Sequence, residues 1–158
     1  MASLKKGSAL RSLFRLPVFL YRLHLGWLLG HRFLLLTHTG RRTGLRRQTV
    51  LEVIEYRKDV PEAVVMSGFG RDSDWLRNIE AAPNPEVAIA AERFAAAFRF
   101  LDEDEASEAI KSYERKNWFA AGIVRTVLSR LLGWKYTGSE GDRRELVRQL
   151  PVIGFRPR

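Results

Sequence analysis

The sequence feature that most constrains this chain is a basic loop between two strand-like runs. Phe33–Thr39 and Thr49–Tyr56 are rich in residues that favour β-strands, and the loop between them is bounded by Gly40 and Gly44. Two such runs joined by a glycine-containing loop are typical of a β-hairpin. Both faces of the second run are mostly apolar, which indicates a strand inside a barrel rather than one with a solvated face.

The loop and its flanks carry a high density of positive charge. Their arginines are Arg41, Arg42, Arg46 and Arg47. Guanidinium groups this close repel one another unless an anion or solvent screens them. Glycines leave backbone N–H groups uncovered, and Thr43 adds a hydroxyl. The residues alone therefore leave two interpretations open, a cradle for a phosphate or carboxylate and a solvated basic turn.

Composition limits the classes of partner. The chain has 158 residues, which suits one domain, and a net charge of +9. Such a charge favours a nucleic acid, an anionic membrane surface or a polyanionic small molecule. No zinc finger, RNP-type motif or basic zipper is present, so we expect no nucleic-acid partner. The lack of cysteine excludes disulfides and a cysteine nucleophile, and fits a reducing, cytoplasmic location.

The three histidines do not predict a metal site. His24, His31 and His38 are spaced seven residues apart, which would align them only on one continuous helix. Because Phe33–Thr39 has the composition of a strand, we expect no bound metal and place each histidine at a surface or partly buried polar position.

We interpret the chain as one α+β domain in three parts. Residues 1–30 are an N-terminal helical segment, 33–101 a barrel core, and 102–158 helices with a closing strand. The N-terminal segment is too short and charged to span a bilayer and has no signal-peptide cleavage site. We expect an amphipathic helix over Ser8–Leu29 that covers the core or lies at a membrane interface.

The remaining elements follow from alternation and helical periodicity. Strands are predicted at Ala63–Ser67, Glu86–Ala91 and Phe94–Leu101, and within Leu146–Phe155. Helices are predicted at Asp74–Ala82, Asp104–Lys116 and Trp118–Leu132, with Gly133–Asp142 as a loop and a turn at Glu92–Arg93.

A second glycine-bounded loop follows the third strand. Its residues are Ser67, Gly68, Phe69 and Gly70. In the helix after it, Trp75 and Asn78 share a face at a spacing of three. The alternatives for these two side chains are core packing and a local hydrogen bond.

These motifs resemble a known family. LLLTHTGRRTGLRRQTVLEV resembles the first signature of the deazaflavin-dependent nitroreductases, and SGFGRDSDWLRNIEAAPNPEVAI resembles their second. The final LPVIGFRP resembles their closing strand. The resemblance implies a split β-barrel of the FMN-binding type that binds coenzyme F-420, a 5-deazaflavin with a phosphodiester-linked oligoglutamate tail.

The resemblance also implies site residues. Gly40–Gly44 would wrap the phosphate or tail, helped by Arg46, Arg47 and Thr49. Ser67–Gly70 would pass beside the ring or the phosphate, and Trp75 and Asn78 would form the pocket wall. The family's second loop often reads S-K-G-G, so a lysine contact is missing at Gly68 unless Arg71 substitutes for it, and Val50 stands where the family commonly has a proline. No catalytic residue is assigned, because the cofactor carries the hydride.

The expected function is therefore that of an oxidoreductase. It would use a reduced deazaflavin to transfer hydride to a conjugated acceptor such as a quinone or nitro compound. The alternatives are an FMN-binding split-barrel protein and a non-enzymatic carrier of an anionic amphiphile such as a fatty acid. The resemblance is compatible with a homodimer, and the N-terminal helix with peripheral membrane contact.

Overall fold

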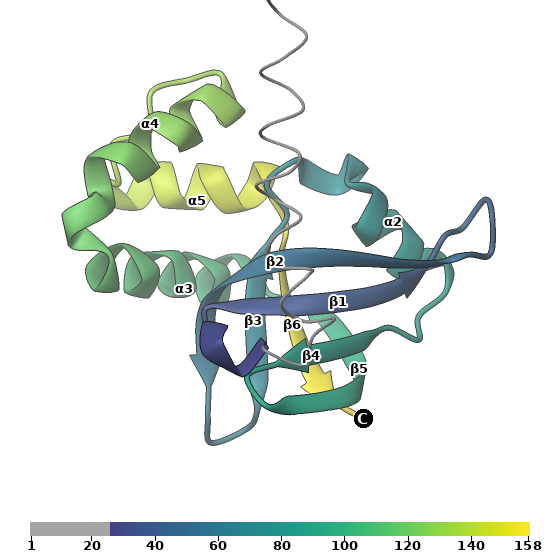
Figure 1. Cartoon of the computed structure of the whole chain (residues 1–158). Helices are drawn as coiled ribbons and strands as arrows, with labels where there is room; N and C mark the ends of the chain where they lie inside the picture. Colours follow the sequence, from purple (N-terminus) through teal and green to yellow (C-terminus); the bar gives the residue numbers. More distant parts are fainter. Residues whose placement is uncertain (1–25) are drawn as a thin grey trace, which may run out of the picture.

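The chain forms a closed six-stranded antiparallel barrel (Figure 1). The structure is a computed structural model that describes residues 26–158. The strands are β1 (Phe33–Thr39), β2 (Arg46–Arg57), β3 (Glu62–Met66), β4 (Glu86–Ile89), β5 (Glu92–Phe100) and β6 (Val152–Pro157). They follow the order β1-β2-β3-β6-β5-β4 around the barrel, and the α+β barrel predicted from the sequence is confirmed.

Strand pairing places the basic loop at one end of the barrel. β1 and β2 form the predicted hairpin, and the last pair before the loop is Thr39 opposite Arg46. The other edge of β1 pairs with β4, which closes the barrel, and β6 lies between β3 and β5 as the closing strand. Full closure pairs the strand edges that an open sheet would expose.

Apolar side chains fill the barrel and also cover its outside. Leu34, Leu36 and Val53 belong to the interior cluster, which Trp75 and other residues of α2 (Asp74–Ala81) complete. Ile54, the next residue along β2, packs instead against the helices. Neighbouring residues of β2 are therefore buried on opposite faces, as its apolar pattern predicts.

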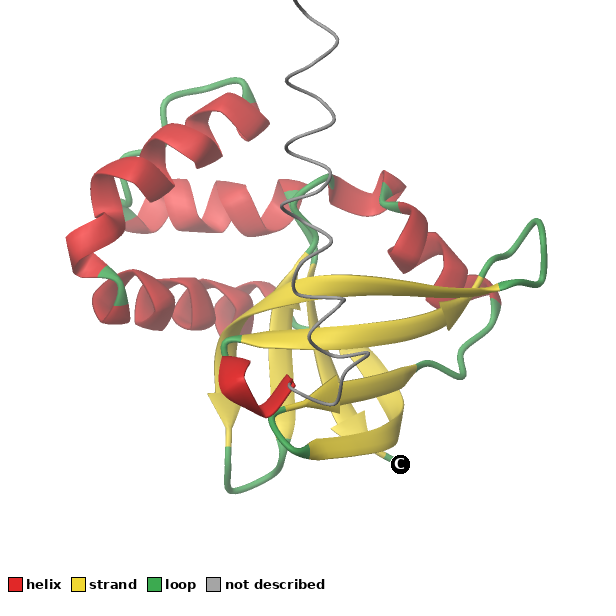
Figure 2. Ribbon diagram, viewed as in Figure 1, coloured by secondary structure: helices red, strands yellow, loops and turns green. Residues whose placement is uncertain are grey.

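The remaining helices gather beside the barrel (Figure 2). They are α3 (Glu103–Lys116), α4 (Ala121–Leu132) and α5 (Glu140–Gln149), with single 3-10 turns at η1 (Gly26–Leu29), η2 (Gly70–Asp72) and η3 (Trp118–Ala120). A second apolar cluster, which includes Val64 and Val152 of the barrel and Ile110 and Leu146 of the helices, joins this group to the strands. None of the helices within residues 26–158 has the length and apolar character needed to cross a membrane.

Two sequence predictions about these elements are wrong. Residues 140–149 form α5, which the sequence analysis divided between a loop and the segment of the last strand. Ser139 caps this helix by accepting a hydrogen bond from the Asp142 N–H, but only Leu146 is fully buried, so the apolar period is weak. The β4–β5 turn lies at residues 90–91 rather than at Glu92–Arg93, which belong to β5. The N-terminal helix expected over Ser8–Leu29 lies outside the described residues except for η1.

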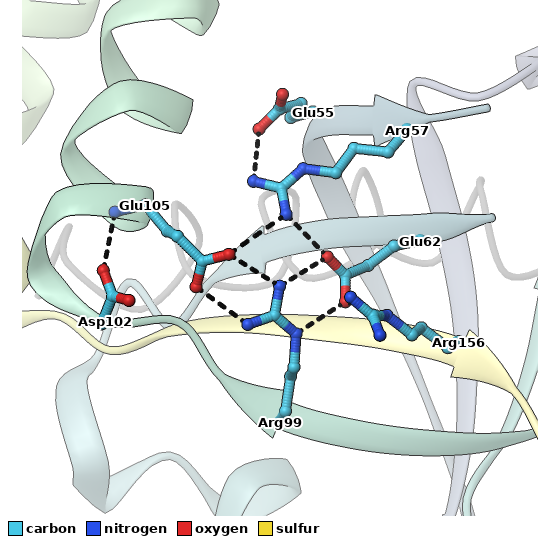
Figure 3. A network of polar contacts seen from close by, with 7 residues as sticks. All are labelled: Glu55, Arg57, Glu62, Arg99, Asp102, Glu105 and Arg156. Carbon is cyan, nitrogen blue, oxygen red and sulfur yellow. Dashed lines mark hydrogen bonds and ion pairs between the residues drawn. The ribbon is translucent and has the colours of Figure 1, made fainter. Parts of the chain in front are cut away.

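A buried carboxylate ties the strands to the helices (Figure 3). The Glu62 side chain, at the start of β3, has no solvent exposure and contacts three arginines from three other strands. Arg57 of β2 donates to Oε1 at 2.9 Å, Arg99 of β5 donates to both oxygens at 2.9 and 3.0 Å, and Arg156 of β6 donates to Oε2 at 2.6 Å. Arg99 also binds Glu105 in the first turn of α3, at 2.8 and 3.0 Å.

These contacts keep Glu62 ionised. Burial raises the pKa of its carboxyl, but the hydrogen bonds and charges of Arg99 and Arg156 outweigh burial and lower the pKa below its usual value. Gly154 of β6 packs directly on this group, since a Cβ at that position would lie 2.7 Å from the Glu62 carboxylate. The carboxylate and the glycine therefore fit together as a pair.

We expect Glu62→Ala to lower the free energy of unfolding by about 3–5 kcal/mol, because it leaves three guanidinium groups without their shared buried partner. Urea unfolding followed by circular dichroism measures this change. The matched control is Glu86→Ala, which removes an exposed carboxylate that pairs with Arg46 at 2.6 Å. That change should cost less than about 1 kcal/mol. Equal losses in the two variants would contradict the role assigned to Glu62.

Candidate functional site

A pocket of about 380 Å³ lies where the β1–β2 hairpin meets α2. Its lining comes from the end of β1, the basic loop, the start of β2 and one face of α2. The lining residues are His38, Gly40, Arg41, Arg42, Thr43, Arg47, Gln48, Thr49, Asp74, Trp75 and Asn78. The structure thus brings together most of the residues that the sequence predicts for a binding site, from two separate motifs.

The loop is held tightly by its own backbone. The Gly44 N–H donates to the Gly40 carbonyl, and the Gly40 N–H donates to the Leu45 carbonyl, both at 2.8 Å. Gly44 has a φ of +69°, which a residue with a side chain rarely adopts. At Gly40 a Cβ would lie 2.8 Å from the Thr43 hydroxyl. Both bounding glycines are therefore required for this loop, which we call the cradle (Gly40–Gly44).

Asn78 attaches the cradle to α2. Its Oδ1 accepts hydrogen bonds from the Arg41 backbone N–H at 3.1 Å and from Arg41 Nη1 at 2.9 Å. Arg41 Nη2 also reaches Asp74, one turn earlier on α2, at 3.1 Å. The side chain of Arg41 is only 21% exposed, and its guanidinium is occupied by these partners. Arg41 therefore positions the loop, and its charge is largely balanced.

His38 continues this chain of hydrogen bonds beneath the pocket. Its Nδ1 lies 3.0 Å from Asn78 Nδ2, and its Nε2 lies 3.3 Å from the Thr49 hydroxyl. Because Asn78 Oδ1 already accepts from Arg41, the Asn78 amide must present its N–H to His38. Nδ1 is then the acceptor, and Nε2 carries the proton and donates to Thr49.

The surroundings of His38 favour this neutral form. Burial of the imidazole lowers the pKa of His38, and the nearby positive charge of Arg47 lowers it further. Asp74 opposes both effects but does not reverse them. Protonation would place a second N–H opposite the Asn78 amide donor, so the link from β1 through Asn78 to the cradle depends on a neutral imidazole.

Two arginines of the pocket remain free to bind an anion. Arg42 and Arg47 form no ion pair with any residue between 26 and 158, and both are exposed. Arg46, by contrast, pairs with Glu86 and does not line the pocket. The capacity for an external anion therefore rests on the side chains of Arg42 and Arg47, because the backbone N–H groups of Gly40, Arg41 and Gly44 already donate within the protein.

The second glycine-bounded loop plays a different part in this structure. The Ser67 hydroxyl donates to the Gly70 carbonyl at 2.6 Å and lies 2.6 Å from the Ser73 hydroxyl. Gly70 has a φ of +73°, and Phe69 is 83% exposed. Ser67–Gly70 thus turns the chain from β3 into α2 and does not line the pocket described above. Its assignment to the cofactor stays a prediction.

Three pocket residues were not predicted as site residues. They are His38, for which the sequence predicts only a surface or partly buried polar position, and Gln48 and Asp74, for which it predicts no binding role. Asp74 precedes Trp75 in the second motif, and His38 lies two residues before Gly40 in the first, so their proximity to predicted residues was the available signal. No group of three or more metal-ligating side chains exists among residues 26–158.

The His38 geometry predicts a pH-dependent stability. The folded state favours neutral His38, so this residue contributes fully to the free energy of unfolding above the pKa of an unfolded histidine, about 6.5. The contribution decreases as the pH falls below that value. We expect the Tm of the wild type to decrease when the pH is lowered from 7.5 to 5.5. The decrease should be smaller in His38→Asn, whose amide oxygen can accept a hydrogen bond from Asn78 without titrating. Thermal unfolding followed by circular dichroism provides the measurement. Identical pH profiles for the two proteins would show that His38 is not the titrating group.

Solved structures with low sequence identity share this fold. A structure described as an F420-H2 dependent reductase (FDR-A) has a TM-score of 0.50 and 18% identity, and the match covers 78% of this chain and 93% of that one. A pyridoxamine 5'-phosphate oxidase-related, FMN binding protein from Nostoc punctiforme has a TM-score of 0.50 and 16% identity, and the match covers 90% of this chain and 80% of that one. These likenesses support the split-barrel fold.

A family model gives the more specific result. A search of the curated proteins finds no significant match. The model of the F420H(2)-dependent quinone reductase family matches residues 17–126, which include the β1–β2 hairpin, the cradle and α2. Because this match covers more than half of the chain, the protein belongs to the F420H(2)-dependent quinone reductase family.

Proposed function

We propose that this enzyme transfers hydride from reduced coenzyme F-420 to a quinone-type acceptor, and that the cradle binds the anionic tail of the cofactor. Membership of the family makes the chain an oxidoreductase that uses this deazaflavin. The observation that supports the tail site is the pair of free arginines, Arg42 and Arg47, beside the pocket formed by the cradle.

The residues present fit such a tail. A phosphodiester and a run of carboxylates need several donors that no protein carboxylate already occupies. Arg42 and Arg47 meet this condition, and both line the pocket beside the cradle. The single phosphate of an FMN-type ligand would also be balanced by two arginines, so the two cofactors are separated by the salt dependence of binding, which grows with the number of anionic contacts.

The roles of the pocket residues follow from their contacts. Arg42 and Arg47 would hold the tail, Arg41 and Asn78 fix the cradle against α2, and His38 orients the Thr49 hydroxyl. Trp75, buried in the barrel cluster, provides the apolar floor. When bound, the reduced deazaflavin supplies the hydride, so the chain needs to bind and orient the reactants and needs no nucleophile of its own.

The choice of acceptor is part of this proposal. The family description names quinones, and a nitro compound is a second conjugated acceptor that a hydride donor could reduce. The homodimer, the cytoplasmic location and the membrane contact through the N-terminal helix remain predictions.

We expect Arg47→Ala to weaken binding of coenzyme F-420 about ten- to hundredfold, since one charge-assisted contact contributes about 1.5–3 kcal/mol. Titration of the cofactor followed by its fluorescence gives the Kd. The matched control is Arg93→Ala, which removes an exposed arginine beside the β4–β5 turn, away from the pocket. Equal affinities for the wild type and Arg47→Ala would contradict the tail site.

The salt dependence of binding separates the cofactors. Several phosphate and carboxylate contacts should make the affinity for coenzyme F-420 fall steeply with ionic strength, whereas binding of FMN, with one phosphate, should depend on it less. We expect Arg47→Ala to reduce this salt dependence. Tight, salt-independent binding of FMN together with no saturable binding of coenzyme F-420 would overturn the proposed function. A steady-state assay with a soluble quinone and a nitroaromatic compound then identifies the preferred acceptor.

A further inference from the structure

An exposed apolar surface runs along η3 and α4, on the side away from the barrel contacts. Its residues are Trp118, Phe119, Ile123, Val127 and Leu131, which are between 44% and 74% exposed. From Phe119 to Leu131 they recur every fourth residue, which places them along one side of the helix. We call this surface the α4 stripe.

The α4 stripe is not needed to hold α4 in place. A second side of the helix, about 100° further round, carries Val124, Leu128 and Leu132, which pack into the cluster shared with α3 and α5. Single exposed apolar residues are common on protein surfaces, but a continuous row that includes two aromatic rings indicates an interaction site. The helix therefore has two apolar sides, and the fold uses only one of them.

The segment that carries the α4 stripe contains only positive charges. The segment Arg115–Lys135 contains five basic residues and no carboxylate. They are Arg115, Lys116, Arg125, Arg130 and Lys135, and within residues 26–158 none of them forms an ion pair. On the neighbouring α5, by contrast, Arg144 and Arg148 pair with Glu103 of α3. The segment that carries the stripe therefore holds cations that no carboxylate within residues 26–158 neutralises.

A hollow beside Trp118 adds a site for an anionic group. The pocket between α3, η3 and α4 has a volume of about 350 Å³ and is lined by Trp118, Lys111, Arg115 and Arg125, among others. Arg143 also lines it, but this arginine is already bound to Glu114 at 3.0 Å. The Glu114 carboxylate lines the pocket as well and is held by Arg143 and Tyr136, so Lys111, Arg115 and Arg125 remain to receive a phosphate beside Trp118.

We propose that the α4 stripe and its flanking cations dock the enzyme onto the surface of an anionic phospholipid bilayer. Aliphatic side chains and amphipathic aromatic rings enter the boundary between head groups and acyl chains, while lysine and arginine bind the phosphates. The helix would lie parallel to the membrane plane. This surface does not include the cradle, so the inference is independent of the proposed function.

Charge complementarity distinguishes this partner from two others. A second copy of the chain would bring the same basic surface against itself, and like charges at an interface disfavour the pairing. Residues 1–25 carry five lysines and arginines and no carboxylate, so they have the same sign as the stripe. An anionic lipid surface supplies both the apolar phase and the opposite charge.

Vesicle co-sedimentation of the full-length protein tests the proposal. We expect binding to phosphatidylcholine vesicles that contain phosphatidylglycerol, weaker binding to phosphatidylcholine alone, and loss of binding at high salt. Phe119→Ser combined with Ile123→Ser should reduce the affinity about tenfold or more. Arg125→Gln combined with Arg130→Gln should reduce binding to the anionic vesicles only.

Matched controls use exposed residues outside the stripe. Val60→Ser changes an apolar residue with 58% exposure in the β2–β3 turn, and Arg93→Gln removes an exposed cation from β5. Both should bind vesicles as the wild type does. The far-UV circular dichroism and the Kd for coenzyme F-420 should be unchanged in all stripe variants, which separates this test from that of the cofactor site.

A second readout reports on Trp118 directly. Lipids brominated on the acyl chain should quench tryptophan emission, and Trp118→Phe should remove most of this quenching. No binding to anionic vesicles, or equal binding by wild type and the Phe119/Ile123 double variant, would overturn the proposal. A dimer in sedimentation equilibrium that the double variant dissociates would assign the stripe to a second copy instead.

Discussion

One buried carboxylate holds the parts of this protein together. Glu62 connects β3 to β2, β5 and β6 through three arginines, and Arg99 extends the connection to Glu105 on α3. Strands of a barrel can be paired by their backbones alone, but the position of the helices beside them needs side-chain contacts. Because α4 and α5 pack against one another and α3, the orientation of the α4 stripe depends in part on this network.

The sequence predicted those elements whose apolar and glycine patterns are local. Apolar alternation in β1 and β2 and the glycines around the cradle were sufficient for the hairpin, and the motif around Trp75 and Asn78 for the helix beside it. Asn78 shows the limit of such reasoning, since the local hydrogen bond considered for its side chain is replaced in the structure by bonds to distant residues. It lines the pocket, and its hydrogen bonds join residues 37 and 40 positions away in the sequence.

The features that the sequence could not predict join residues that are far apart along the chain or lack a clear apolar period. Glu62 was not singled out, because its partners Arg99 and Arg156 are 37 and 94 residues away. For α5, a single fully buried residue left no helical period to detect. The net charge of +9 likewise does not tell which basic residues are paired with carboxylates and which are not. Within residues 26–158, some arginines pair with carboxylates, whereas Arg42, Arg47 and the cations of Arg115–Lys135 pair with none.

The close fit between Gly154 and Glu62 has a consequence for how this family can vary. Any side chain at position 154 would meet a carboxylate that three guanidinium groups prevent from moving aside. Conversely, a shorter residue at position 62 would leave a space that a larger residue at 154 could fill. The two positions should therefore change together during evolution, and a relative with alanine or serine at 154 should also lack the long acid opposite it.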